Sequence, residues 1–134
     1  MAHQNSLLAS LSEADNALLA PHLEPIELPL GMVLVEPAKV IAHAIFIETG
    51  LCSVVSGLAE GGRVEVGLFG RDGMAVPTLI LGVDTIPHQI FMQVAGRGQR
   101  IPVAALRAAA EASRSLRDLL LRYVQTFLVQ VAQT

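Results

Sequence analysis

The chain has 134 residues, 52% of them hydrophobic, and its nine basic and twelve acidic residues give a formal charge of −3. This length fits one domain with its own core, and the acidic balance excludes a chain that binds nucleic acid through a concentrated basic face. A single cysteine, Cys52, excludes an internal disulfide and a cysteine-rich metal site. The sequence shows no apolar leader and no apolar run of membrane-spanning length, so we expect a cytoplasmic location and no membrane contact.

The first part of the chain predicts short helices over residues 5–19. Ser12 precedes an acidic turn in the manner of a capping box, with Asp15 where Glu is usual. Pro21 then ends the helical segment. After it, the apolar period changes from helical spacing to two, which predicts a half-buried edge strand with its apolar side chains on one face. These side chains are Ile26, Leu28 and Leu30.

The middle of the chain reads as short strands separated by glycine-containing turns. The strands are expected at 32–35, 43–48, 52–56, 64–69 and 89–94, with turns at 49–50 and 59–62. A short interrupted helix is expected over 72–81, and an alanine-rich helix over 103–111. This order predicts an α+β fold, an antiparallel β-roll of the jelly-roll kind with short helices before it and a long helix after it.

The last predicted element is an amphipathic helix over residues 113–134, about 30 Å long at ~1.5 Å per residue. Its apolar side chains recur at spacings of three and four and form a stripe. The stripe contains Leu116, Leu120, Tyr123, Val124, Phe127 and Val131. One interpretation is that this face packs on the strands of the same chain. The stripe is wide enough for a second contact as well, and we predict a homodimer through this helix.

Several motifs resemble the sensor domain of Crp/Fnr-type bacterial transcription regulators. They are the segment Gly50–Val55, the strand Val64–Phe69, the turn Gly70–Met74 and the long last helix. The likeness is to a branch of that family with Leu-Ala-Pro-His-Leu-Glu-Pro near the start, here Leu19–Pro25, and Pro-His after the ligand cassette, here Pro87-His88. The resemblance extends over nearly the whole chain.

The resemblance implies a cyclic-nucleotide-binding-like β-roll over residues 1–112 and a dimerisation helix over 113–134. In that family the helix pairs two subunits and leads to a helix-turn-helix domain that binds DNA, which is absent from this sequence. The resemblance therefore implies a non-catalytic sensor for an unknown small-molecule effector, acting as a homodimer, with DNA as a partner only through the absent domain.

The nucleotide-binding relatives hold their ligand through a Glu on the ribose hydroxyl and an Arg-Ser or Arg-Ala pair on the cyclic phosphate. In this chain Arg71 occupies the Glu position, and Pro87 and His88 fall near the Arg-Ser positions. Both anchors are missing, so cyclic AMP binding is not expected.

Two other ligand classes stay open. An anion is conceivable at a helix start near Asp72, beside Arg71, although Asp72 as a simple N-cap is the alternative. An apolar ligand in the roll interior is the other, against a filled core. The candidate binding residues are Gly70, Arg71, Asp72, Gly73, Met74, His88 and Gln89, and the interior candidates are Met74, Val76, Leu79, Ile80, Phe91 and Met92.

Other chemistries have little support in the sequence. The four histidines are scattered without metal-ligand spacing, so neither a metal nor a cofactor is predicted. Ser53 and Ser56 have no neighbouring base, and Cys52 lies in an apolar strand. A small cupin-like enzyme and a free-standing nucleotide-binding-like protein remain as alternatives to the regulator.

Overall fold

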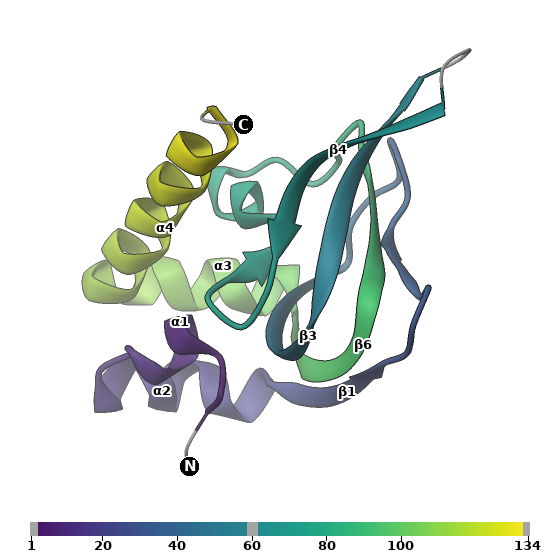
Figure 1. Cartoon of the computed structure of the whole chain (residues 1–134). Helices are drawn as coiled ribbons and strands as arrows, with labels where there is room; N and C mark the ends of the chain where they lie inside the picture. Colours follow the sequence, from purple (N-terminus) through teal and green to yellow (C-terminus); the bar gives the residue numbers. More distant parts are fainter. Residues whose placement is uncertain (1–2, 59–61, 133–134) are drawn as a thin grey trace.

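The computed structural model describes residues 3–58 and 62–132. Two long strands, β3 (His43–Leu58) and β6 (Gln89–Pro102), lie at the centre of its sheet. The order across the sheet is β1 (Glu24–Leu28), β6, β3, β4 (Gly62–Phe69), and β2 (Val33–Val35) and β5 (Met74–Ala75) add to β6 and β3. Every pairing is antiparallel. The strands curl into a roll with the helices on one side (Figure 1), which confirms the predicted fold class.

Both long strands bend at glycines. Gly50 has a φ of +94°, a left-handed value that glycine adopts without strain. A Cβ added at Gly96 would overlap the Thr49 carbonyl oxygen, so only glycine allows the two strands to approach this closely. β3 pairs with β6 on both sides of the bend. The predicted turn at Thr49-Gly50 between two short strands is therefore wrong: it is a bend inside one continuous strand.

The N-terminal helices are short and capped by side chains. They are α1 (Ser6–Ala9), α2 (Glu13–Leu19) and the 3₁₀ turn η1 (Ala20–His22). The Leu8 amide donates to Asn5 Oδ1 at 3.0 Å, and the Asp15 amide donates to Ser12 Oγ at 3.1 Å. The second bond confirms Ser12 as the predicted N-cap.

Two helices follow the roll, α3 (Val103–Ala112) and α4 (Arg114–Ala132). Ser113 separates them, with an extended backbone and a hydroxyl that accepts from the Leu116 amide at 3.2 Å. This break lets α4 turn back along the roll (Figure 1). No helix in the described ranges is both long and apolar enough to cross a membrane.

The segment from 70 to 81 differs from the prediction. It contains a turn, the short strand β5 and a 3₁₀ helix η2 (Pro77–Leu81), rather than a helix from Asp72. Proline disfavours the α conformation in the residue before it and has no amide to give to a helix, so a helical segment here begins at Pro77. β1 also ends earlier than predicted, and Leu30 is 71% exposed. Of the predicted hairpin tip at 59–62, residues 59–61 lie outside the described ranges.

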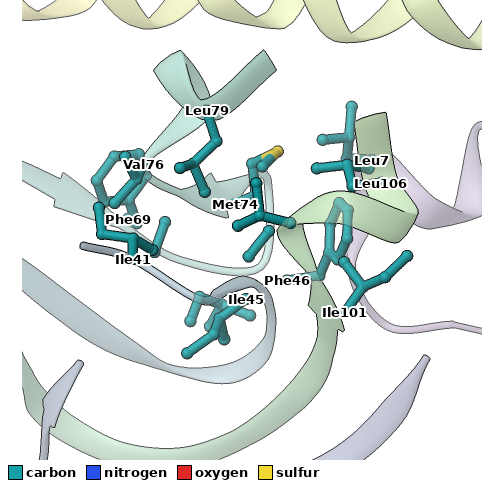
Figure 2. Packing of buried hydrophobic residues seen from close by; sticks show 14 of the residues in the cluster. Leu7, Ile41, Ile45, Phe46, Phe69, Met74, Val76, Leu79, Ile101 and Leu106 are labelled. Atoms are coloured by element: carbon teal, nitrogen blue, oxygen red, sulfur yellow. The ribbon is translucent and has the colours of Figure 1, made fainter. Parts of the chain in front are cut away.

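One core joins the roll interior to the helices. Figure 2 shows Leu7 and Leu106, from α1 and α3, pointing into the same interior as Phe46 and Ile101, from β3 and β6. All four are buried. The helices therefore belong to the folded unit of the roll, and their position relative to the strands is fixed by shared packing.

Candidate functional site

The turn at 70–73, where the anion site was predicted, is held by the N-terminal helix. The Asn5 side-chain amide donates to the carbonyls of Ile47 at 2.6 Å and Gly73 at 2.7 Å. The Ser6 amide donates to the Arg71 carbonyl at 2.7 Å. No helix starts at this turn among the described residues, so the predicted helix N-terminus for an anion is wrong. The turn connects α1 to the roll.

Tyr123, on α4, packs on the other side of this turn. A Cβ added at Gly73 would overlap the Tyr123 hydroxyl, so the contact leaves no free space. Burial raises the pKa of Tyr123 to about 12, and a hydrogen bond with the Met74 backbone opposes this. The phenol is therefore neutral at physiological pH. This contact fixes α4 against the turn that leads into β5.

One helical turn further along α4, the packing opens into an apolar cavity of about 400 Å³ between α4, the strands and the segment around η2. It is lined by Val54, Val66, Phe69, Val76, Pro77, Thr78, Ile86, Pro87, His88, Ile90 and Phe127. Among these described lining residues none is Arg, Lys, Asp or Glu. Thr78 and His88 supply the polar side chains.

Phe127 is the contribution of α4 to the cavity wall. Its ring stacks on that of Phe69 with centroids 4.9 Å apart and an interplanar angle of 11°. Such pairs add about 0.5–1.5 kcal/mol beyond area burial. Phe127 is only partly buried, whereas Phe69 is buried in the core. The side of the cavity formed by α4 is thus aromatic, and Phe127 on that side is more exposed than Phe69 on the side formed by the roll.

A β-bulge shapes the strand side of the cavity. Val54 pairs with Gly67 and Val55 pairs with Glu65, so Val66 has no opposite residue on β3. Bulges re-aim side chains, and they recur beside functional sites. Here the bulged residue lines the cavity.

Val76, also in the wall, has an unusual backbone. Its φ of 57° and ψ of 67° are left-handed, although it is β-branched and 4% exposed. A positive φ at a β-branched residue is a steric outlier, and such residues persist only where surrounding packing enforces them. Pro77 contributes, because it disfavours the right-handed helical alternative for Val76.

The structure separates the predicted ligand-binding residues. His88 lines the cavity, whereas Met74 is buried in the core and the Gln89 amide donates to Glu36 Oε1 at 3.1 Å. Arg71 lines a separate surface hollow with His3 and Glu48. The remaining members, Gly70, Asp72 and Gly73, form the turn described above, and none of them lines the cavity. Of the interior candidates, only Val76 lines it.

The sequence signals for the missed residues are weak. Phe69 and Phe127 are two of only four phenylalanines, and aromatic residues are scarce at 4% of the chain. That scarcity makes each aromatic position informative, but nothing in the spacing of 58 residues predicts that the two rings stack.

The predicted dimer residues on α4 divide into two groups. Leu116, Leu120 and Val124 are buried within their own chain, so the prediction that they contact a partner is wrong for these three residues. Leu116 and Leu120 belong to the core cluster that also contains residues of α3 and of the strands. Tyr123 and Phe127 are partly buried against the same core. The side chain of Val131 lies outside the described part of the structure. On the outer side, Leu128 and Val129 are about half exposed.

The described residues show neither an activated thiol nor a group of metal ligands. Burial raises the pKa of the Cys52 thiol to about 12, the opposite of the change that makes a thiol reactive. Cys52 does not line the cavity with His88. Within residues 3–58 and 62–132 no three His, Cys, Asp or Glu side chains are grouped as metal ligands.

Comparisons with solved structures show which fold this is. The sensor domain of the transcriptional regulator DNR from Pseudomonas aeruginosa matches with a TM-score of 0.74 and 15% identity, over 96% of this chain and 86% of that one. The N-terminal domain of a transcriptional regulator from Streptomyces coelicolor A3(2) matches with a TM-score of 0.71 and 12% identity, over 97% of this chain and 92% of that one. The catabolite activator protein of Thermus thermophilus matches with a TM-score of 0.76 and 10% identity, over 96% of this chain and 60% of that one.

No protein-family model matches the chain, and no curated protein matches it. The similarity is therefore one of structure rather than of sequence. The fold is that of a cyclic-nucleotide-binding domain, as in the sensor domains of Crp/Fnr-type transcription regulators, which confirms the predicted architecture.

Proposed function

We propose that this chain is a non-catalytic sensor and dimerisation module of a Crp/Fnr-like transcription regulator. The observation that carries the proposal is the position of α4, which closes one side of an apolar cavity through Phe127. A ligand in this cavity would contact the helix directly. The similarity of the fold to sensor domains of transcription regulators supports the same role.

The proposal assigns separate roles to the two faces of α4. The inner face holds the helix on the roll of residues 1–112, and the outer face of 113–134 meets a second copy. Half-exposed Leu128 and Val129, with partly buried Leu121, provide apolar surface for that contact. Helices that pair in this way carry apolar residues at alternating spacings of three and four, which repeat every seven residues, and Leu121 and Leu128 are one such repeat apart on the same side of the helix.

The proposal gives the chain no catalytic role and makes DNA a partner only through a further domain. The net charge of −3 supports this division, because phosphate binding needs clustered Lys and Arg. No observation in the described residues favours the cupin-like alternative, since it would need a cluster of metal ligands.

Light scattering on the chain at micromolar concentration tests the proposal, with a dimer expected. Leu128→Glu with Val129→Glu should give a folded monomer, because the two charges would be buried at the interface. The matched control is Leu30→Glu, in the segment between β1 and β2, where the side chain is already mostly exposed. A parent chain that is monomeric, or a double variant that stays dimeric, contradicts the proposal.

A further inference from the structure

We infer that the cavity beside Phe127 binds an uncharged aromatic small molecule. The inference rests on the proposed sensor role and specifies the class of effector. The described residues that line this cavity include no Arg, Lys, Asp or Glu. A buried ionic group needs a counter-charge or several hydrogen bonds. This wall has no Arg, Lys, Asp or Glu side chain to supply a counter-charge, and only Thr78 and His88 among its described residues have polar side chains. The wall therefore selects against phosphates and carboxylates.

The shape of the wall favours a flat molecule. Phe69 and Phe127 present a nearly parallel pair of rings on one side, and Pro77 and Pro87 add two more rigid rings to the lining. Aromatic ligands gain offset-stacked or edge contacts with such rings in addition to area burial. The volume of about 400 Å³ lies in the lower part of the range of about 300–1,000 Å³ for small-molecule sites. A two-ring compound suits that size.

Two polar side chains in the wall would orient a bound ligand. Thr78 and His88 are both partly buried in the wall. A hydroxyl donates and accepts, and a neutral imidazole offers one donor and one acceptor. One hydroxyl or amine on the ligand can therefore be matched, whereas the rest of its surface meets carbon. Apolar walls with few convergent polar groups are typical of ligand sites.

The backbone of Val76 is an independent observation at the same place. A buried β-branched residue with a φ of 57° is held against its own steric preference, and such residues cluster at ligand clamps and switch regions. The bulge at Val66 forms the facing part of the wall. Two backbone irregularities thus shape one cavity.

Binding of such a molecule would affect the packing of α4. A ring seated against Phe127 changes the packing of the partly buried end of the helix, whereas Tyr123, one turn away, stays fixed on Gly73.

The test uses three probes on the whole chain. N-phenyl-1-naphthylamine, which fluoresces in apolar sites, is titrated first, and micromolar saturable binding is expected. It is then displaced by 1-naphthol and by 1-naphthoate, which share a ring system and differ in charge at pH 7.5. Displacement by 1-naphthol at a concentration at least tenfold lower is expected. Equal or better displacement by 1-naphthoate, or no saturable binding of the first probe, overturns the inference.

Three variants, one of them a control, locate the binding. Val66→Trp fills the cavity from β4 and should weaken probe binding at least tenfold, whereas Leu68→Trp on the same strand, where the side chain is half exposed and outside the lining, should leave it unchanged. Pro87→Lys, at an exposed position in the lining, should reverse the preference toward 1-naphthoate and does not disturb the core. Equal probe affinity in Val66→Trp and Leu68→Trp, or an unchanged preference in Pro87→Lys, places the probe elsewhere and contradicts the inference.

Light scattering of the same samples separates the two proposals. A dimer that fails to bind the probe contradicts the ligand class and leaves the sensor role standing. A monomer that binds the probe with the expected preference supports the ligand class and contradicts the dimerisation module.

Discussion

The two halves of α4 differ in how they meet the roll. In the first half, Leu116 and Leu120 are at most 2% exposed, and Tyr123 lies on Gly73 with no space left. In the second half, Phe127 borders a cavity, and Leu128 is 53% exposed. The same helix is thus anchored at its start and loosely held toward its end. Under the proposed sensor role, a ligand-dependent change is expected in the half around Phe127, because the other half is part of the core.

Loss of core contacts in the first half should have the largest effect. Leu116→Ala removes a fully buried side chain, and we expect the free energy of unfolding to fall by about 3 kcal/mol. Leu128→Ala, on the half-exposed side of the second half, should change it by less than about 0.5 kcal/mol in the monomer. Urea unfolding of both variants at low protein concentration makes the comparison. Similar losses would show that the two halves are equally anchored.

The contact between Tyr123 and Gly73 should be the next most sensitive. Gly73→Ala places a methyl group on the Tyr123 hydroxyl, and we expect a loss of about 2 kcal/mol from overpacking. Gly67→Ala is the matched control, because its Cβ would lie 3.8 Å from Val54 and 3.9 Å from Phe127, at ordinary contact distance. Its effect should stay below about 1 kcal/mol. If Tyr123→Leu does not relieve Gly73→Ala, the clash is not with the tyrosine.

These differences also show how far the sequence predicts the fold. A period of two and a period of three to four predict strands and an amphipathic helix, and both are correct. Periodicity says which side of a helix is apolar and not what covers it. Leu116, Leu120 and Val124, predicted to contact a partner, are buried within their own chain. Which surface covers a helix depends on tertiary packing, and the local sequence pattern does not contain that information.

The candidate site was harder to predict, for three physical reasons. The cavity lining comes from β3, β4, β6, α4 and the segment around η2, so no local spacing connects its members. Val66 lies in a bulge, which interrupts the alternation that would place it. Val76 is left-handed although β-branched residues favour extended backbone, so its sequence indicates the wrong conformation. His88 was predicted because the resemblance marks its position.

The anchor at the start of α4 should depend on pH, with a smaller effect. Asp15 on α2 accepts hydrogen bonds from Ser113 Oγ at 2.5 Å and Ser115 Oγ at 2.6 Å. The bond from Ser113, followed by that from Ser115, lowers the pKa of the Asp15 carboxyl below 3.8. Because the folded pKa lies below the unfolded one, the contribution is full above the unfolded pKa and is lost as the pH falls through the folded pKa.

Asp15→Asn should therefore lower the free energy of unfolding by about 1 kcal/mol at pH 7, where the charge-assisted bonds are present. The difference between the variant and the parent should shrink as the pH falls from about 5 to below 3.8. Urea unfolding at several pH values measures it. Asp118→Asn, on the exposed side of α4, is the control and should show no such convergence. A constant difference across that range would mean that the Asp15 charge does not hold the helix start.

The smallest effect is expected from cyclic AMP, which should leave both halves of α4 unchanged. The cavity beside Phe127 has no carboxylate for the ribose and no guanidinium for the phosphate among its described lining residues. Losing a charge-assisted phosphate anchor alone costs about 1.5–3 kcal/mol, and two anchors are lost together. Arg71→Glu should not restore affinity, because Arg71 lines the hollow with His3 and Glu48 rather than the cavity. Calorimetry and thermal unfolding with millimolar cyclic AMP should show neither heat nor a shift for the parent and the variant. A micromolar dissociation constant for the parent would mean that a phosphate can be held by Thr78, His88 and the backbone alone, and that the second half of α4 responds to an anion.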